Sequence, residues 1–337
     1  MVKGMKVLLP EEKGYKANLH CHTTGSDGVL TPEQMKKAYK DNGFSILAFT
    51  DHAYMEARSA LNDENFVALS GYENHLEPTW IKGKPRSTKC YHLNFYSPDP
   101  KKVGMIGITD YYFDFCTKVY RKLDRLPTEL LENGEYFKGA DGGFGVKNLN
   151  GLLKQAAELG YFVVLNHPDW SRLAAEDICG IKGLGGVEIF NYGSFVGGCT
   201  EDEAYYDVML RDGQKLYCFS NDDNHGDTGF GGYNVMYPEK LTYGGVFECM
   251  KSGKFYASTG AAIRGAYVDG NKVYVGAENA KSIAFRADGY SRNVWAAEKP
   301  LTHAEFELNE SVRYFRIAVT DTNGGKAYTN AFFKEEL

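Results

Sequence analysis

The chain has 337 residues, of which 43% are apolar and 24% are charged, and its formal net charge is −6. At about 150 residues per domain, this length predicts one large domain and a smaller one, and the composition excludes a wholly disordered chain. We expect neither a membrane span nor a secretory signal, because no run approaches about 20 apolar residues and the start turns acidic early. The 38 Lys and Arg against 44 Asp and Glu also argue against a nucleic-acid partner, although a local basic patch would escape this test.

The cysteines indicate a reducing compartment. There are seven of them, they are widely spaced, and no two form a CxxC pair. An odd number without paired spacing is typical neither of a disulfide framework nor of a zinc ribbon. The sequence therefore predicts reduced, mostly buried thiols in a cytoplasmic protein.

Apolar runs and helical patterns alternate along the first two-thirds of the chain. Runs that end in polar residues predict buried strands at 15–22, 45–52, 66–73, 161–169, 186–191 and 216–225. A helix is predicted from a Thr31 cap and Pro32 to a stop at Gly43, and a second one with the same layout from Asn148 to Gly160. This alternation predicts an α/β fold with parallel strands, in a barrel or barrel-like sheet, with ligands at the carboxyl ends of the strands.

Two segments depart from this alternation. Residues 104–145 hold an aromatic cluster, a basic helix-like run and a glycine-rich loop, which predicts an insertion that caps the site. After Ser258, alternating runs are separated by the turn sequences DGN and NGG, which are typical of β-hairpins. We therefore expect a large domain over residues 1–258 and a small all-β, sandwich-like domain over residues 259–337.

Nine histidines and carboxylates lie at or near the ends of the predicted strands. They are His20, His22, Asp27, His52, Glu73, His92, His167, Asp223 and His225. Each one alone has an ordinary explanation, since buried histidines are usually hydrogen-bonded and Asp at a strand end often caps a helix. Burying all of them together without a cation would be very costly. Because all are nitrogen or oxygen donors, the set predicts a site for Zn, Mn or Fe.

The motifs that carry these residues resemble a known family. The string NLHCHTTGSDGVLTPEQMKKAYKDNGFSILAFTDH resembles the opening of the PHP (polymerase and histidinol phosphatase) superfamily. The later pieces SGYE, YHLNFY, LNHPDW, GVEIFN and SNDDNH follow in the order usual for that family. The resemblance covers about residues 15–226, and the remainder resembles bacterial members with a small C-terminal β domain. The insertion at 104–145 departs from the minimal family pattern.

The resemblance implies a distorted, seven-stranded β/α barrel of TIM-like form with two or three divalent metal ions. His20, His22, Glu73 and Asp223 would hold the first ion. Glu73 would bridge to a second ion that His92 and His167 complete. Asp27, His52 and His225 would hold a third. No expected ligand is missing, which argues against an inactive member of the family.

Such a centre predicts a metal-dependent hydrolase, and the preferred reaction is phosphate release from a small phosphorylated metabolite or nucleotide. The nucleophile would be a hydroxide shared by two metal ions. Asp51 and His225 are the candidate catalytic residues. Asp51 would either orient a ligand histidine or cap a loop, and Glu188 and Asn191 are further candidates for supporting the ligands. The leaving-group acid stays open between a metal-bound water, a ligand histidine and no acid at all.

An anionic small-molecule substrate requires cationic contacts. Arg172, which follows the LNHPDW motif, and Lys84 and Arg86, in the loop before His92, are the candidates, although such charges are usually solvated surface. Trp170 and Trp80 would either stack on the substrate or pack against a strand end.

Three alternative functions are consistent with part of this interpretation. An amide, carbamate or ester hydrolase would use the same metal site in a more apolar pocket. A non-catalytic metal- or sugar-binding module would use the β domain as its recognition surface. A polymerase-associated proofreading nuclease is disfavoured, because the chain lacks polymerase segments and has an acidic charge balance.

Overall fold

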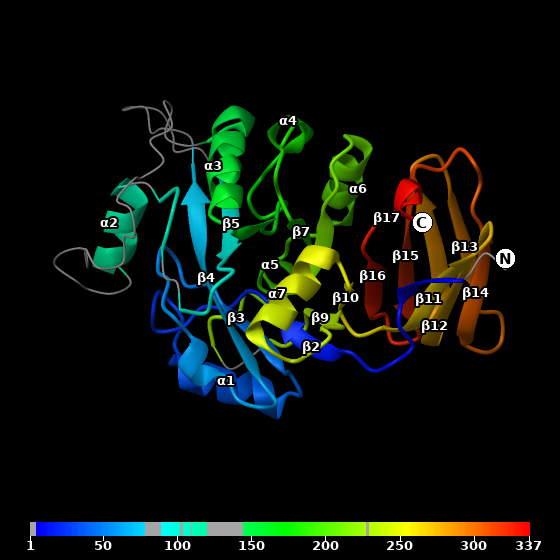
Figure 1. Ribbon diagram of the computed structural model, residues 1–337, viewed down its shortest axis with the longest axis horizontal. Helices are drawn as coiled ribbons and strands as arrows, with labels where there is room; N and C mark the ends of the chain where they lie inside the picture. The colour runs from blue at the N-terminus through cyan, green and yellow to red at the C-terminus, as the bar shows by residue number, and fades with distance from the viewer. Residues whose placement is uncertain (1–4, 78–88, 102–103, 109, 120–143, 227–228) are drawn as a thin grey trace.

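The computed structural model describes residues 5–77, 89–101, 104–108, 110–119, 144–226 and 229–337. Figure 1 shows an elongated molecule, with helices around one group of strands at one end and the C-terminal strands grouped at the other. None of the helices in these ranges is both long and apolar enough to cross a membrane.

Seven strands lie side by side in chain order and carry the candidate site. They are β2 (Tyr15–Asn18), β3 (Ile46–Phe49), β4 (Val67–Leu76), β5 (Tyr91–Tyr96), β6 (Phe162–Leu165), β7 (Gly186–Asn191) and β8 (Tyr217–Asn221). Every residue of β3, β5, β6 and β7 is buried, which is typical of strands covered on both faces. All six strands expected from the apolar runs are present. Most end before their polar residues, which therefore lie in the loops that follow.

One strand contradicts the prediction of a parallel sheet. The pairs β2–β3, β3–β4, β6–β7 and β7–β8 are parallel, whereas β5 runs antiparallel to both β4 and β6. Two neighbouring parallel strands need a crossover connection, which returns the chain to the end of the sheet at which the first strand began. Here Leu76 pairs with Tyr91, so the chain turns back on itself between β4 and β5.

The predicted barrel is not confirmed as a closed structure. Within the described ranges, no strand ladder joins β8 to β2, and β2 pairs instead with β9 (Tyr233–Met236). The two ends of the row do meet beyond the strands. The amide of His22 donates to the carbonyl of Asn224 (2.8 Å), and the amide of Asp223 donates to the carbonyl of His20 (3.0 Å). These two hydrogen bonds thus link the loops after β2 and β8, the first and last strands of the row, at the end where the candidate ligands lie.

Helices α1, α3, α4 and α6 lie around the outside of these strands (Figure 1), whereas α7 packs with Ile46, Val67 and Val164 on their opposite face. The helices are α1 (Pro32–Asp41), α2 (Asp110–Val119), α3 (Val146–Glu158), α4 (Ala175–Ile178), α5 (Tyr192–Val196), α6 (Glu203–Arg211) and α7 (Tyr243–Ser252), with short 3₁₀ turns at Ser59–Leu61 and Lys334–Glu336. The helix α2 belongs to the predicted insertion and includes its aromatic cluster. Residues 120–143, which hold most of the basic run and the glycine-rich loop, lie outside the described residues.

The two helices predicted from their caps differ in outcome. Helix α1 is confirmed, because the Thr31 hydroxyl accepts from the Gln34 amide (3.3 Å) and the Gln34 side chain accepts from the Thr31 amide (2.9 Å). Helix α3 begins two residues earlier than predicted. Its cap is Gly145, which offers no side-chain hydrogen bond, so the assignment of Asn148 as the first residue was wrong. Burial of Leu149, Leu152 and other apolar residues, rather than a cap, accounts for this helix.

The C-terminal part of the chain is built from strands, as predicted. The remaining strands are β1 (Lys6–Leu9), β10 (Phe255–Ser258), β11 (Ala262–Asp269), β12 (Lys272–Ala287), β13 (Ser291–Trp295), β14 (Leu301–Glu307), β15 (Tyr314–Asp321), β16 (Lys326–Thr329) and β17 (Phe332–Phe333). Both predicted hairpins are present, since DGN joins the antiparallel pair β11–β12 and NGG joins β15–β16.

These strands enclose an apolar core that includes Ile283, Phe285 and Ile317. The N-terminal strand β1 adds to this core by pairing with β11, and β10 pairs with both β9 and β16. The C-terminal strands are therefore joined to the rest of the molecule by backbone pairing. The division of the chain at residue 258 stays a prediction.

Candidate metal centre

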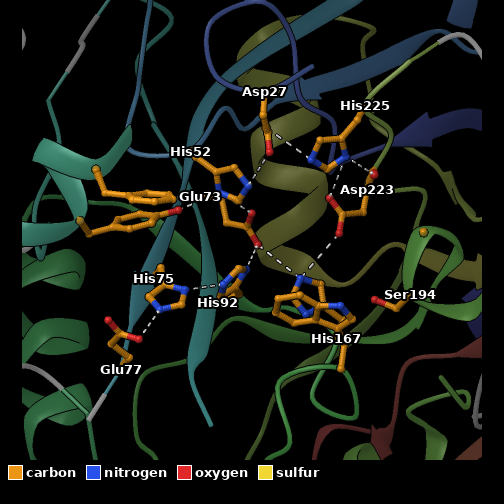
Figure 2. A pocket seen from close by; sticks show the side chains of 14 residues that line it. Asp27, His52, Glu73, His75, Glu77, His92, His167, Ser194, Asp223 and His225 are labelled. Atoms are coloured by element: carbon orange, nitrogen blue, oxygen red, sulfur yellow. Dashed lines mark hydrogen bonds and ion pairs between the residues drawn. The ribbon is translucent and has the colours of Figure 1, made fainter. Parts of the chain in front are cut away.

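The nine predicted ligands converge at one end of the seven strands. Figure 2 shows the ones that line a pocket, which are Asp27, His52, Glu73, His92, His167, Asp223 and His225. Most of them lie in loops that directly follow a strand, and two lie within strands. Glu73 sits inside β4, which continues to Leu76, so the prediction that Glu73 closes its strand was wrong. His92 is the second residue of β5. His167 and Asp223 have positive φ angles of 26° and 54°, an uncommon backbone conformation that is often found at functional sites.

These side chains form three overlapping groups, and within each group one candidate ligand atom per residue lies within 4.8 Å of the others. The groups are His20, His22, Glu73 and Asp223; Glu73, His92 and His167; and His22, Asp27, His52 and His225. They contain the three sets that the family resemblance implies. The structure adds His22 to the third group and makes Glu73 and His22 common to two groups each.

Three of the four residues of the first group are almost completely buried. The Nε2 atoms of His20 and His22 are 3.2 Å apart, and Asp223 Oδ1 lies 3.2 Å from the first and 3.0 Å from the second. Glu73 Oε1 lies 3.5 Å from His20 Nε2. The side chains of His20, His22 and Glu73 are at most 1% exposed, so water does not screen these contacts.

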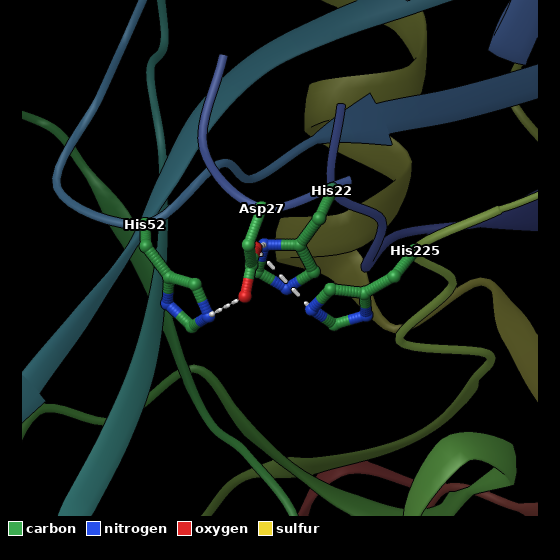
Figure 3. A group of neighbouring side chains, drawn as sticks. All are labelled: His22, Asp27, His52 and His225. Atoms are coloured by element: carbon green, nitrogen blue, oxygen red, sulfur yellow. Dashed lines mark ion pairs between the residues drawn. The ribbon is translucent and has the colours of Figure 1, made fainter. Parts of the chain in front are cut away.

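The other two groups extend from Glu73 and His22. In the second, Glu73 Oε1 lies 3.0 Å from His92 Nδ1 and 3.4 Å from His167 Nε2. In the third, Asp27 lies between two imidazoles, with its Oδ2 3.6 Å from His52 Nε2 and its Oδ1 3.4 Å from His225 Nε2 (Figure 3).

Each of the six histidines also contacts a second group through a ring nitrogen. The contacts join His20 Nδ1 to Glu188 (2.8 Å), His22 Nδ1 to Ser26 (3.4 Å), His52 Nδ1 to Tyr112 (2.8 Å), His92 Nε2 to His75 (2.6 Å), His167 Nδ1 to Ser171 (3.3 Å) and His225 Nδ1 to the carbonyl of Asp223 (2.9 Å). Metal-binding histidines almost always have such a partner, because it fixes the tautomer and the orientation of the ring.

Most hydrogen bonds of the Asp51 side chain in the described structure go to the loop that carries Asp27. The Asp51 carboxylate accepts hydrogen bonds from the Thr23 amide (2.6 Å), the Thr23 hydroxyl (2.8 and 3.0 Å) and the Ser26 hydroxyl (3.1 Å), and Arg58 lies 3.3 Å away. It thus holds the loop that carries Asp27. The contact to a ligand histidine is indirect, through Ser26, and the loop-capping alternative is the one that the structure matches.

The charges of the centre shift each other's pKa values. Burial alone would lower the pKa of His20, but nearby carboxylates, Asp223 foremost, raise it well above its usual value. Burial alone would raise the pKa of Glu73, but nearby imidazoles, His92 foremost, lower it well below its usual value. Burial lowers the pKa of His52 to about 3. Ionised carboxylates and neutral imidazoles are the forms that bind metals, and Glu73 and His52 are held in them.

The centre forms the floor of a cavity of about 450 Å³. Its wall includes the aromatic side chains of Tyr112, Phe115 and Trp170, together with His75 and Glu77. Trp170 is 43% exposed, and its ring centroid lies 5.1 Å from that of His92. The stacking position predicted for Trp170 at the site is therefore available, whereas Trp80 lies outside the described residues.

Of the predicted substrate-binding cations, the structure describes Arg172. It is exposed and is not among the residues that line the cavity. Lys84 and Arg86 lie outside the described residues. In the same loop, the Lys89 ammonium lies 2.7 Å from Asp177 and also stays outside the cavity wall.

Sequence reasoning missed several residues that the structure places at the centre. The Asn166 side chain donates to Glu73 (2.7 Å), and Tyr112 and Ser171 contact ligand histidines. Asn166 is the second residue of the LNHPDW motif and Ser171 directly follows it, so their proximity to His167 was a usable signal. Tyr112 lies in the insertion, where no motif marks it. Glu188 and Asn191 were anticipated, and the Glu188 carboxylate accepts from the Asn191 side chain (2.8 Å).

A group of divalent cations fits this donor set. Asp223 Oδ1 is buried and has no hydrogen-bond donor among the described residues, although two imidazole nitrogens lie within 3.2 Å. Buried carboxylate oxygens are normally paired, and here the paired group would have to be a cation that faces several donors at once. Nitrogen and oxygen donors suit Zn, Mn or Fe.

Comparison with known proteins places the N-terminal part of the chain in a family. Residues 18–117 match the family model of the PHP domain. This range holds His20, His22, Asp27, His52, Glu73 and His92. The resemblance predicted from the motifs is thereby confirmed over residues 18–117, which match the PHP domain.

Among characterised proteins, a 5′-3′ exoribonuclease of Haemophilus influenzae is 30% identical over 95 residues. The match covers 27% of this chain and 33% of the relative, so it spans about a third of that protein.

Two solved structures are similar at low identity. One is a two-domain protein from Bacteroides vulgatus containing a predicted PHP-like metal-dependent phosphoesterase, with 13% identity and a TM-score of 0.43 over 97% of this chain and 98% of that one. The other is an amidohydrolase from Chromobacterium violaceum, with 17% identity and a TM-score of 0.42 over 69% and 96%. Neither TM-score reaches 0.5, so the assignment rests on the family match.

Proposed function

We propose that this protein is a metal-dependent hydrolase, and specifically a phosphoesterase that releases phosphate from a small phosphorylated metabolite or nucleotide. The observation that carries the proposal is the convergence of nine candidate nitrogen and oxygen ligands in three overlapping groups, with seven of the nine residues lining a cavity. Glu73 belongs to two of these groups, as a carboxylate shared by neighbouring ions would.

The chain's own residues would hold and orient the ions. His20, His22, Glu73 and Asp223 would hold one, Glu73, His92 and His167 a second, and Asp27, His52 and His225 a third. Divalent ions, when bound, lower the pKa of water and neutralise charge that develops on phosphoryl or carbonyl oxygens. His225 has the most exposed side chain of the six histidines, at 40%, and faces the cavity, which keeps it as the candidate for proton transfer to the leaving group.

A phosphoester is the preferred substrate class for two reasons. The Haemophilus influenzae relative is an exoribonuclease, and ribonuclease chemistry breaks a phosphoester bond. A centre that concentrates divalent charge at the end of a cavity also suits an anionic group, whose charge the ions offset.

The aromatic wall supports a second candidate function. Tyr112, Phe115 and Trp170 line the cavity, whereas none of the described residues that line it is a lysine or arginine. An amide, carbamate or ester hydrolase would use the same ligands with a less charged substrate. The nature of the leaving group is therefore the property to test.

The first experiment measures phosphate release from a panel of phosphomonoesters and nucleotides, with added Mn²⁺ and with a chelator. We expect chelator-sensitive release, and a loss of at least about 1,000-fold in kcat/KM for Asp223→Ala, which removes a ligand of the first group. Asp41→Ala is the matched control, because Asp41 is an exposed carboxylate on α1 that pairs only with Lys37 in the described structure.

The outcomes separate the candidates. Loss of phosphate release in Asp223→Ala but not in Asp41→Ala supports the phosphoesterase. Bound metal with cleavage of amides or esters, and no phosphate release, favours the second candidate. A near-normal rate in Asp223→Ala, with unchanged metal content, would contradict the site itself.

A further inference from the structure

Within the described part of the chain, His52 is the candidate ligand histidine whose ring nitrogen contacts a residue of the predicted insertion. The Tyr112 hydroxyl, on α2, lies 2.8 Å from His52 Nδ1. The partners of the other five come from the loops and strands of the centre itself. The other ring nitrogen of His52, Nε2, faces Asp27 in the third group (Figure 3). His52 therefore lies between α2 and that group.

The position of α2 is fixed relative to the centre. The Tyr72 hydroxyl donates to the carbonyl of Ile106 (2.9 Å), and the Asn74 side chain donates to the carbonyl of Gly107 (2.8 Å). Tyr72 and Asn74 are the two neighbours of Glu73 on β4. The segment that leads into α2 is thus tied to the strand that carries the shared ligand.

Tyr112 itself is held firmly. It is only 6% exposed, and its ring stacks on His75 with centroids 5.0 Å apart. Cys116, one turn further along α2, is also buried in the apolar core. The hydroxyl of Tyr112 is therefore presented to His52 from a fixed direction.

We propose that Tyr112 is a positioning residue for His52, through which α2 sets how tightly the group His22, Asp27, His52 and His225 binds a divalent ion. The proposal rests on the metal centre of the proposed function. A neutral imidazole that binds a cation through Nε2 carries its proton on Nδ1, and that N–H then donates to the Tyr112 oxygen. The contact selects the tautomer and holds the ring plane toward Asp27.

Glu73 is the competing partner for this proton, because its Oε2 lies 3.1 Å from His52 Nδ1. The Glu73 carboxylate, however, belongs to both other groups. When those groups hold ions, its oxygens are engaged, and Tyr112 remains the acceptor for His52. The effect of Tyr112 should therefore appear in the third and last binding step.

The test is divalent-ion binding to Tyr112→Phe, which keeps the ring and removes only the hydroxyl. Chelator-stripped protein is titrated with Mn²⁺, and bound metal per chain is measured after ultrafiltration at buffered free Mn²⁺. Loss of such an outer partner typically weakens metal affinity by 10–100-fold. We expect at least about a tenfold weaker last step, full occupancy restored by a proportionate excess of Mn²⁺, and earlier steps unchanged.

Tyr161→Phe is the matched control. Tyr161 is also a buried tyrosine that anchors this segment, since its hydroxyl donates to the carbonyl of Gly104, but it contacts no ligand histidine in the described structure. It should bind Mn²⁺ as the unmodified protein does. Thermal unfolding of both variants without metal reports any loss of packing.

The results distinguish this proposal from the proposed function. If the unmodified protein binds no divalent ion, the metal centre fails and the role of Tyr112 fails with it. If the unmodified protein binds ions and Tyr112→Phe binds them equally well, only the role of Tyr112 is overturned. Equal weakening in Tyr161→Phe would overturn it too, because the effect would then belong to packing.

Discussion

Two buried clusters of charge in this molecule differ in how they are balanced. One is the candidate metal centre, and the other lies between α6 and β15. In the second, the Arg316 side chain is fully buried, with its Nε 2.8 Å from Asp207 and a terminal nitrogen 2.8 Å from Glu203. One fixed cation from the chain thus faces two carboxylates.

Among the described residues, the metal centre contains no lysine or arginine that could serve as such a fixed cation. Its carboxylates and imidazoles face one another, and Asp223 Oδ1 has no hydrogen-bond donor among the described residues. The comparison teaches that burial of charge alone does not indicate function. A functional site is indicated instead by buried hydrogen-bond acceptors for which the described residues provide no donor.

The comparison predicts the largest stability effect at the Arg316 cluster. Arg316→Met removes the cation and leaves two partly buried carboxylates next to each other, which should lower the free energy of unfolding by about 3 kcal/mol. Metal content should not change. Urea unfolding, followed by circular dichroism, measures the first quantity, and metal analysis of the purified variant measures the second.

An exposed ion pair provides the control for this variant. Arg264 pairs with Glu278, and both side chains are 49% exposed. Arg264→Met should therefore change stability by less than about 0.5 kcal/mol. If both variants were equally destabilised, the burial of Arg316 would not be the cause.

A smaller effect is expected at Glu188, which supports the metal centre without belonging to the three groups. Its Oε1 accepts from His20 Nδ1 (2.8 Å) and from Asn221 (2.9 Å), while its Oε2 accepts from the His167 amide (3.0 Å) and from Asn191 (2.8 Å). In Glu188→Gln, one of these oxygens becomes an NH₂ group that meets donors. Metal affinity should fall by about 10–100-fold.

Competition with a chelating dye measures this affinity. Glu176→Gln is the control, because Glu176 is 77% exposed and lies outside the centre. Unchanged metal affinity in Glu188→Gln would show that the contact between Glu188 and His20 does not affect how tightly His20 binds the metal ion.

The sequence predicted which candidate ligands lie close together, because most of them follow a topological rule. His20, His22 and His52 come directly after strands whose carboxyl ends lie side by side, so their spacing along the chain translates into proximity. Glu73 and His92 lie within strands instead, and the antiparallel direction of β5 is what brings His92 beside Glu73. That direction depends on the connection between the two strands, for which the sequence offers no periodic signal.

The supporting residues were harder to predict, because their roles depend on tertiary contacts. Asp51 directly precedes a ligand histidine, yet its carboxylate points to the loop at Thr23 and Ser26. Tyr112 is distant in sequence from every motif, and α2 brings it to His52. Arg172 follows a motif in the sequence but does not line the cavity, and its role in substrate binding stays a prediction.

The smallest predicted effect concerns Asp202, a single buried carboxyl group outside the metal centre. In the described structure it forms no ion pair with a lysine or arginine. It directly precedes α6, is 2% exposed, and its carboxylate accepts from the Asp169 amide (2.8 Å). Burial, only partly offset by this hydrogen bond, raises the pKa of Asp202 to about 8. The folded state thus binds the proton more tightly than the unfolded state, where the pKa is about 4.

Stability from this carboxyl is therefore fully present below about pH 4 and is lost as the pH rises toward 8. Asp202→Asn keeps the oxygen that accepts from Asp169 and cannot ionise. Its stability relative to the unmodified protein should rise by at least about 1 kcal/mol between pH 5 and pH 8, as measured by urea unfolding at each pH. The exposed Asp41→Asn should show no such trend. If the difference in unfolding free energy between Asp202→Asn and the unmodified protein stayed constant from pH 5 to pH 8, the ionised Asp202 would be stabilised as well as the carboxylates around Arg316. Burial of a carboxylate at this position would then not require a cation.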